Sequence, residues 1–351
     1  MRIMRGSMGT PETTACGAPI AEVSRGRQVE SRHFGHIVAV DTDGRALFAF
    51  GDPDRPTYPR SALKPIQALA GVLNGIDQRF GFSTAELAVV CASHQGELRH
   101  RLAVQSILDK IGATEADLHY GLHAPADVAS RDELIRSGRG LTPIYNNCSG
   151  KHAGMLALAR VLGAEMQGYW NFDHPVQQQI RSTYRQLCGD TSSHEVQWAV
   201  DGCAIPTYLM TLRQLATGFA RLSQPERLDP VWADATRRVT GAMMAEPDMV
   251  GGAEARDSIL MRSLPHRIVA KAGAEGVQAL GLIGRGIGIA IKVEDGSQRP
   301  LWPVCFAILQ RLDHLPDPLP TALMDFRQPE IRNTRNEPVG FVSAGRCVHA
   351  R

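Results

Sequence analysis

Three side chains that can take part in chemistry lie close together in residues 146–152. Cys148, Lys151 and His152 supply a thiol, an amine and an imidazole within this short segment. From Met155 onward, apolar residues recur at i, i+3, i+4 and i+7, which predicts an amphipathic helix. Because residues three apart share one face of a helix, Cys148 and Lys151 are expected to point toward a common centre.

Cys148, Lys151 and Cys203 could bind zinc together, with Cys203 delivered at the C-terminal end of a strand predicted over 196–200. Two thiolates and one nitrogen leave a fourth position open, which is typical of a working zinc site rather than a structural one. Lysine is a rare ligand, because removing its proton at pH 7 costs about 4.6 kcal/mol. The alternative interpretation is a set of buried free cysteines.

Ser61 and Lys64 place a hydroxyl and an amine on the first turn of a predicted helix. Pro65 marks that start, because proline is tolerated only near the beginning of a helix. A free lysine is neutral in only about one molecule in two thousand at pH 7, but burial can lower its pKa by several units. The neutral amine could then take the serine proton, as in serine acyl-transfer enzymes of the penicillin-binding class. The alternative is an N-cap serine beside a solvated lysine.

A second hydroxyl and a second amine stand at Ser93 and Lys271. Ser93 is expected at a strand-to-helix turn, where a plain N-cap is the alternative interpretation. Lys271 ends a predicted strand over 266–271 and enters a loop of small residues. This arrangement is similar to the Lys-Thr-Gly strand of the penicillin-binding class, with alanine in place of threonine. A lysine on a sheet edge would explain the same pattern without chemistry.

Lysine is scarce in this chain. Of 38 basic residues only five are lysine, at positions 64, 110, 151, 271 and 292. Arginine evidently serves where charge alone matters, so the lysines that remain include sites where an amine must lose its proton. Three of the five fall in the motifs described above.

The composition excludes several classes of protein. A chain of 351 residues with 43% hydrophobic content predicts one large domain or two small ones, and a net charge of +2 does not indicate a nucleic-acid or membrane-surface partner. We expect no membrane span, no secretory signal and a flexible N-terminal extension over 1–30. The seven scattered cysteines are therefore expected to stay reduced.

Predicted strands near both ends of the chain enclose a helical middle. A hairpin is expected over 36–50 and strands over 266–271 and 287–293, with helices over 98–111, 150–163, 175–188, 208–222, 229–245 and 302–312. This order predicts an α/β (α+β) fold in which an antiparallel sheet from both termini carries an inserted helical subdomain. The expected single catalytic domain, 31–351, has a sheet lobe (31–60 and 265–345) and a helical lobe (61–264). Active sites commonly lie where two such lobes meet.

Five motifs together resemble those of the Rhizobium-type L-asparaginases, the thermolabile asparaginase II family. The motifs are Arg60-Ser-Ala-Leu-Lys-Pro65, Cys91-Ala-Ser-His94, Asn147-Cys-Ser-Gly-Lys-His152, Asp201-Gly-Cys203 and Lys271-Ala-Gly-Ala-Glu-Gly276. The resemblance covers roughly residues 20–345 in the same order, and about 20 additional residues precede it.

The resemblance implies a fold, a reaction and a set of site residues. The family resembles serine β-lactamases and serine-dependent glutaminases in fold, is cytoplasmic and is typically a homodimer. The implied reaction is hydrolysis of L-asparagine to L-aspartate and ammonia. The implied site residues are two serine–lysine pairs (Ser61 with Lys64, Ser93 with Lys271), a zinc held by Cys148, Lys151 and Cys203, and the lining residues Arg60, His152 and Asp201.

We therefore expect an amidohydrolase in which Ser61, activated by Lys64, attacks the side-chain amide carbon. Ser93 is the alternative nucleophile, because the sequence does not settle which of the two serines attacks. Ser93 and Lys271 would assist proton transfer, support the leaving ammonia or stabilise the oxyanion. Zinc would orient the substrate rather than generate hydroxide, because two thiolates largely neutralise its charge. His152 and Asp201 would support the site or bind the charged ends of the substrate.

Three alternatives remain open. A glutaminase or broader ω-amidase fits the same residues, because one methylene is worth only roughly 1–3 kcal/mol of discrimination. A β-lactamase or transpeptidase is disfavoured, because the chain lacks an export signal, a Ser-Asp-Asn motif and a true Lys-Thr-Gly. A non-enzymatic zinc-binding or sensor protein would leave both serine–lysine pairs without a use.

Overall fold

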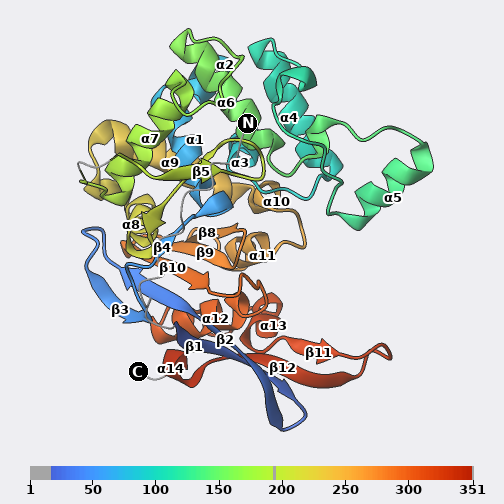
Figure 1. The fold of residues 1–351 in the computed structure, drawn as a ribbon, viewed down its shortest axis with the longest axis vertical. Coiled ribbons are helices and arrows are strands. Elements are labelled where there is room, and N and C mark those ends of the chain that lie inside the picture. Colours follow the sequence, from blue (N-terminus) through green and yellow to red (C-terminus); the bar gives the residue numbers. More distant parts are fainter. Residues whose placement is uncertain (1–16, 193–194, 350–351) are drawn as a thin grey trace, which may run out of the picture.

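One antiparallel sheet runs through the middle of this computed structural model, which describes residues 17–192 and 195–349. Its strands are β1 (Ala18–Arg25), β2 (Gln28–Val40), β3 (Ala46–Phe50), β8 (Ile268–Gly273), β9 (Val277–Leu282), β10 (Ile287–Val293), β11 (Glu330–Arg332) and β12 (Pro338–Ala344). The order across the sheet is β11-β12-β1-β2-β10-β9-β8, and β3 pairs with the second half of β2. The predicted antiparallel sheet from both terminal regions is confirmed (Figure 1).

The chain between β3 and β8 is mostly helical and forms the upper part of Figure 1. Its helices are α1 (Lys64–Leu73), α2 (Ile76–Phe80), α3 (Thr84–Val90), α4 (Leu98–Ile111), α5 (Val128–Ser137), α6 (Ser149–Leu162), α7 (Pro175–Cys188), α8 (Leu212–Ser223), α9 (Pro230–Ala245), α10 (Pro247–Val250) and α11 (Arg256–Ser263). Within the described ranges, none of the helices has the length and apolar character that crossing a membrane requires.

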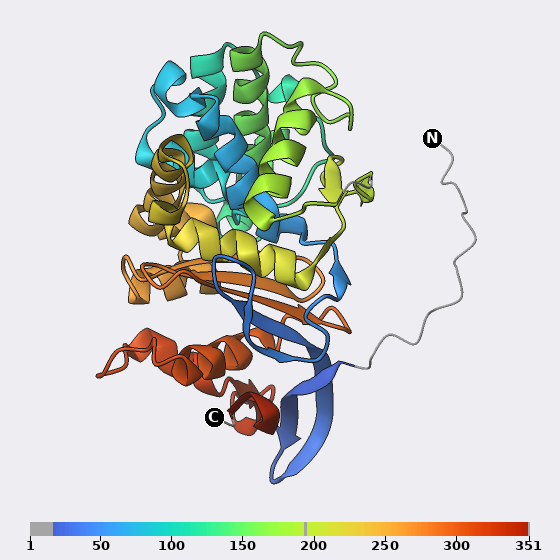
Figure 2. The ribbon, with the colours of Figure 1, turned by 90° about the vertical axis from the view of Figure 1, so that its left-hand side faces the viewer.

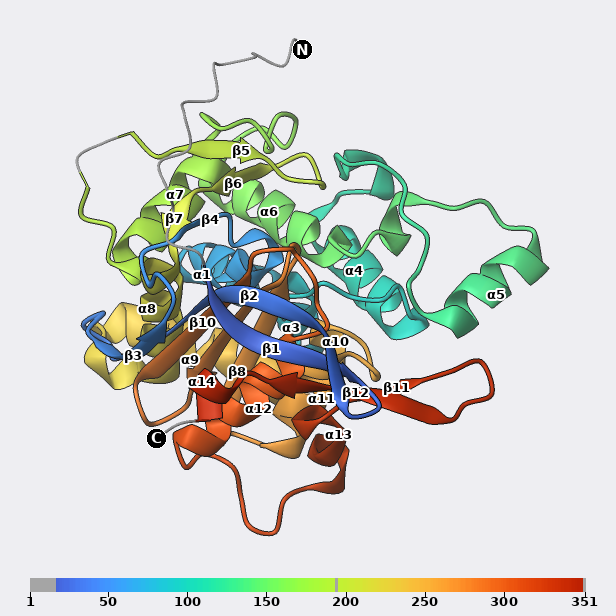
Figure 3. The same cartoon turned by 60° about the horizontal axis from the view of Figure 1, so that its bottom comes forward.

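Shorter elements complete the chain. The 3-10 turns are η1 (Arg60–Leu63), η2 (Glu115–Asp117), η3 (Pro143–Tyr145), η4 (Pro225–Arg227) and η5 (Thr321–Leu323). Two small ribbons pair β4 (Pro56–Thr57) with β7 (Met210–Thr211) and β5 (Trp198–Val200) with β6 (Pro206–Tyr208). The remaining helices are α12 (Leu301–Arg311), α13 (Met324–Arg327) and α14 (Arg346–His349). Figure 3 shows α5 projecting from the side of the molecule.

Helices cover both faces of the sheet. Helix α8 lies on one face against β2, β9 and β10, and α12 and α14 lie on the other against β1 and β12 (Figure 2). Gly288 of β10 allows α8 to approach closely, because a Cβ at this position would lie 1.8 Å from the carbonyl oxygen of Ala216. Every residue of β9 is buried, as expected for a strand covered on both sides.

The predicted flexible extension over 1–30 is wrong for residues 18–30. Strand β1 pairs with both β2 and β12, and Ile20 and Ala21 are fully buried. The segment contains few apolar residues, but neighbours on both sides satisfy its backbone hydrogen-bonding groups and so hold it in the sheet. Residues 1–16 lie outside the described part of the chain.

Two local predictions also need correction. The segment before Ser93 was expected to be a strand but forms α3, which begins with a reciprocal capping box between Ser83 and Glu86. The helix predicted over 208–222 begins only at Leu212, because β6 and β7 occupy the preceding residues and Thr211 caps the helix. The helices predicted over 98–111 and 175–188 match α4 and α7, and those predicted over 150–163, 229–245 and 302–312 differ from α6, α9 and α12 by one residue. The strand at 268–273 includes Lys271 rather than ending at it.

Candidate active site

Ser93 lies between two lysine amines. Its Oγ is 2.9 Å from Lys64 Nζ and 2.9 Å from Lys271 Nζ. Each amine also donates to a backbone carbonyl, Lys64 to Ala92 at 2.6 Å and Lys271 to Ala272 at 3.0 Å. These additional bonds fix both amines against the hydroxyl, so the three groups form one hydrogen-bonded unit.

Three separate elements bring this unit together. Ser93 follows α3 in the loop before α4, Lys64 begins α1, and Lys271 lies on β8. Pro65 occupies an early position of α1, where its missing N–H has no cost. The helical region and the sheet therefore meet at Ser93, as expected for a site between two lobes.

Burial changes the protonation of both amines. Lys64 is 1% exposed and Lys271 is 2% exposed. Burial disfavours the charged form and lowers the pKa of Lys64. Burial likewise lowers the pKa of Lys271 to about 8, although the nearby Asp257 carboxylate opposes the change. Both amines are therefore easier to deprotonate than a lysine amine in water.

Ser61 lies close to this unit but is not joined to it. Its hydroxyl has no hydrogen-bond partner among the described residues, and it lines a pocket of about 640 Å³ together with Ser93 and Lys271. Arg60, directly before it, has a φ of 52°, a conformation that costs a non-glycine residue energy. The structure brings the four predicted residues together, but both lysines contact Ser93 rather than one lysine contacting each serine.

His94 connects the Ser93 loop to the start of α6. Its Nδ1 accepts from the backbone N–H of Gly96 at 3.1 Å, so the proton is on Nε2, which lies 2.7 Å from Ser149 Oγ. Burial lowers the pKa of His94 well below its usual value and keeps the ring neutral. Sequence spacing does not predict this contact, because Ser149 is 55 residues from His94 in the chain.

The predicted thiol–amine cluster is assembled at the start of α6. Cys148 is the residue that precedes the helix, and Lys151 Nζ lies 2.7 Å from Cys203 Sγ in the turn between β5 and β6. A hydrogen bond between the two sulfur atoms lowers the pKa of Cys148 well below its usual value and raises that of Cys203. Burial opposes the charge on Lys151, but both sulfur atoms raise its pKa.

Arg60 and Asp201 form an ion pair beside this cluster. Asp201 Oδ1 also accepts from the backbone N–H of Gly202 at 2.8 Å, and Cys203 Sγ lies 3.6 Å from Oδ2. Burial raises the pKa of Asp201, but the charges of Lys151 and Arg60 outweigh it and hold the pKa below its usual value. Asp201 therefore links the turn that carries Cys203 to the residue before Ser61.

His152 has a buried ring nitrogen with no partner. The backbone N–H of His119 donates to Tyr169 Oη at 3.0 Å, and Tyr169 Oη lies 2.6 Å from His152 Nδ1. His152 Nε2 and Tyr120 Oη are both buried and unpaired, and the two rings meet edge to face at 4.6 Å. Tyr120 was missed because no sequence motif includes it.

The three predicted zinc ligands have the chemistry that zinc prefers. Cys148, Lys151 and Cys203 are each at most 5% exposed and converge through the contacts given above. Thiolate and neutral nitrogen ligands suit zinc, and the unpaired His152 Nε2 beside them marks a polar space. The described residues contain no group of three or more His, Cys, Asp or Glu side chains placed to hold a metal. The candidate set has two thiols and depends on the lysine.

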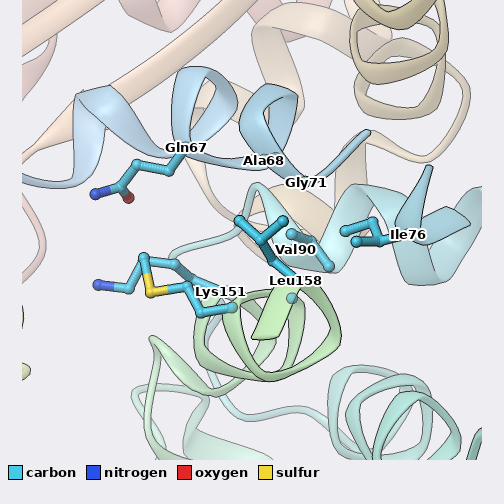
Figure 4. A pocket seen from close by; sticks show the side chains of 9 residues that line it. Gln67, Ala68, Gly71, Ile76, Val90, Lys151 and Leu158 are labelled. Carbon is cyan, nitrogen blue, oxygen red and sulfur yellow. The ribbon is translucent and has the colours of Figure 1, made fainter. Parts of the chain in front are cut away.

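A small cavity lies behind Lys151, between α1, α2, α3 and α6. Its volume is about 10 Å³, and its walls are mainly apolar residues such as Ile76, Val90 and Leu158. Figure 4 shows the polar ends of Gln67 and Lys151 on one side of it. A space of this size holds at most one water molecule, so it is not a substrate site.

Comparison with known proteins identifies the family. A sequence model of the family described as L-asparaginase II matches residues 21–344, so the chain belongs to this family. No curated protein matches the chain in sequence. A structure of Mglu in its glutamate form shares 18% identity at a TM-score of 0.36, covering 80% of this chain and 61% of that one.

Two further solved structures are similar at a comparable level. A putative beta-lactamase from Bacteroides dorei DSM 17855 shares 14% identity at a TM-score of 0.39, covering 74% of this chain and 84% of that one. EstCE1, a hydrolase with promiscuous acyltransferase activity, shares 13% identity at 0.38, covering 74% and 88% respectively. This chain therefore spans less than two thirds of the length of Mglu but most of the other two.

Proposed function

We propose that this member of the L-asparaginase II family is an amidohydrolase that converts L-asparagine to L-aspartate and ammonia. The observation that carries the proposal is Ser93 Oγ between two buried amines, in a pocket that Ser61 also lines. Two hydroxyls and two amines at one pocket provide both a nucleophile and a route for protons, which acyl transfer requires.

We assign Ser61 as the nucleophile and Ser93 as the proton relay. Ser93 Oγ has an amine at each side, so its lone pairs are engaged. The Ser61 hydroxyl has no such contact in the described residues and is free to attack. A neutral Lys64 has two N–H groups, which can serve Ala92 and Ser93, and its lone pair remains available for the Ser61 proton.

In the proposed acylation, a bond forms between Ser61 Oγ and the side-chain amide carbon while the Ser61 proton passes to Lys64. The carbon–nitrogen bond then breaks, and Lys271 supplies a proton through Ser93 so that ammonia leaves. Water hydrolyses the resulting ester, releases L-aspartate and restores the Ser61 hydroxyl. Protons return from Lys64 to Lys271 along the same Ser93 contact.

We further propose that Cys148, Lys151 and Cys203 hold zinc. When bound, zinc would supply an open position that helps to orient the substrate. Asp201 fixes the Cys203 turn and positions Arg60, while His152, whose Nε2 is buried without a partner, follows Lys151 directly in the chain. These groups bind and orient, and the bond changes belong to the serines and lysines. The family resemblance adds three further proposals: the Rhizobium-type subtype, a cytoplasmic location and a homodimer.

A glutaminase or broader ω-amidase activity is the second candidate. The pocket volume of about 640 Å³ favours it, because pockets of this size commonly hold ligands larger than an amino acid. One more methylene in the substrate would not be rejected strongly by such a space. Comparing L-asparagine with L-glutamine decides between the two candidates.

Ammonia release from purified protein tests the proposal. With L-asparagine, we expect turnover that Ser61→Ala lowers by about 10³-fold or more and Ser93→Ala by about 10²- to 10⁴-fold. Ser137→Ala, at the exposed end of α5, is the matched control and should keep full activity. Mass spectrometry of quenched enzyme should locate the acyl group on Ser61. Full activity in Ser61→Ala would overturn the assignment, and activity with glutamine alone would select the second candidate.

A further inference from the structure

Arg256 is a cation without an anion in the candidate active-site pocket. It begins α11, remains partly open to solvent, and lines the same pocket as Ser61, Ser93 and Lys271. No carboxylate among the described residues forms an ion pair with it, and its guanidinium carbon lies 5.9 Å from the centre of the Trp302 ring. Arg299 also lines this pocket, but it has an acidic neighbour, because its charge helps to lower the pKa of Glu30.

The surroundings of Arg256 are rigid. The next residue, Asp257, accepts from the backbone N–H of Ala272 at 2.6 Å and from Gln278 Nε2 at 2.9 Å. These bonds tie the first turn of α11 to β8, directly beside Lys271, and Figure 1 shows the two elements next to each other. Trp302 is 4% exposed and packs against Phe326 with ring centroids 4.9 Å apart. The backbone that carries Arg256 is thus held in place, and so is the Trp302 ring near its guanidinium.

We propose that Arg256 binds the α-carboxylate of the substrate and so restricts the enzyme to free ω-amide amino acids. The proposal rests on the amidohydrolase function proposed above and adds the recognition of the backbone end of the substrate. A guanidinium pairs with a carboxylate through two parallel hydrogen bonds, which fix direction as well as affinity. Glu254 lines the same pocket without an ion-pair partner and offers a carboxylate to the α-ammonium group.

Partial removal from water supports this assignment. Burial lowers the pKa of Arg256, and no acidic side chain in the described residues compensates for it. An anionic ligand would restore the lost stabilisation of the charge. Other arginines near the site, such as Arg60, are already paired and cannot offer both arms of the guanidinium.

The test compares L-asparagine with L-asparagine α-methyl ester and with succinamate, which keeps the carboxylate but lacks the amine. We expect wild type to prefer L-asparagine over the ester by about 10- to 100-fold in kcat/KM, and Arg256→Gln to lose this preference mainly through KM. Succinamate should remain sensitive to Arg256→Gln. The preference of Arg256→Lys should lie between those of wild type and Arg256→Gln. Arg237 pairs with Glu226 on the surface, so Arg237→Gln serves as the control and should match wild type.

Two results would overturn the inference. One is an unchanged preference for L-asparagine over its ester in Arg256→Gln, with turnover by the wild type intact, which would leave the proposed function standing. The other comes from calorimetric measurement of L-aspartate binding. We expect wild type to bind L-aspartate about 10- to 100-fold more tightly than Arg256→Gln does. Equal binding, or no binding to wild type, rejects the role of Arg256. Because this measurement needs no turnover, it decides the inference even if no amide is hydrolysed.

Discussion

Burial determines what the amines of Lys64 and Lys271 can do. In water both would be protonated at pH 7, but each is almost completely covered and has a lowered pKa. Lys151, equally buried, has a raised pKa because two sulfur atoms are its neighbours. Burial therefore makes the lysine amine easier to deprotonate at two positions, whereas the sulfur atoms favour the charged amine at the third.

Titration of Lys271 predicts a pH limit for the proposed activity. Its pKa of about 8 means that Lys271 carries the proton needed by the leaving ammonia below that pH and loses it above. We expect kcat/KM for L-asparagine to fall as the pH rises through about 8. Lys271→Arg stays protonated, so any activity that remains should not fall in that range.

The control for this pH measurement is Lys110→Arg, a lysine that pairs with Glu86 outside the pocket and should leave the profile unchanged. A fall at the same pH in Lys271→Arg would assign the titration to another group. The relevant measurement is kcat/KM over the full pH range, because a measurement at one pH cannot distinguish a changed pH dependence from an overall loss of activity.

At the scale of elements, the crossing of α6 over α3 sets the position of the thiol–amine cluster. Gly150 and Gly154 face α3, where a Cβ would lie 2.1 Å from the carbonyl oxygen of Val89 and 2.5 Å from Val90 Cγ1. The first contact is with backbone, which cannot move aside as a side chain can. This close approach brings Cys148 and Lys151 toward the loop that carries Ser93.

Gly150→Ala should therefore destabilise the fold and displace the cluster. We expect a loss of about 1–3 kcal/mol in the free energy of unfolding, measured by denaturant titration, because the helices must separate. Gly241→Ala in α9 is the matched control: nothing lies within 4 Å of its Cβ position. It should be neutral or stabilising by up to about 1 kcal/mol, because alanine favours a helix. Equal stability of the two variants would contradict the packing argument.

The sequence contains local signals of helix starts that the pattern of apolar residues does not reveal. Ser83 and Glu86 are spaced as a capping box and predict the start of α3, although the apolar run after them suggested a strand. Strand β1 has no comparable signal, because its pairing partners β2 and β12 are brought together only by the complete sheet. Periodicity therefore predicts α4 and α6 near the site but not α3, and it does not predict the long-range pairing of β1.

On the scale of the whole molecule, chain order predicted the sheet and motif spacing predicted the residues that meet at the site. Cys148 and Lys151 are near in sequence, so the geometry of one helix start brings them together, whereas Lys64 contacts Ser93 rather than the nearby Ser61. The bridge from Lys64 to Ser93 and the positions of Tyr120 and Arg256 depend on the folded arrangement of distant segments. No spacing rule connects those residues.

Zinc binding should stabilise the whole molecule, because its proposed ligands join α6 to the β5–β6 turn. A metal that binds only the folded state, at 100 times its dissociation constant, adds about 2.7 kcal/mol to the free energy of unfolding. We expect chelation to lower the melting temperature by a few degrees and added zinc to restore it. Cys203→Ser should abolish this response, whereas Cys347→Ser, at a partly exposed cysteine outside the cluster, should retain it. A wild-type melting temperature that does not change with zinc would reject the proposed site, since this readout does not depend on activity.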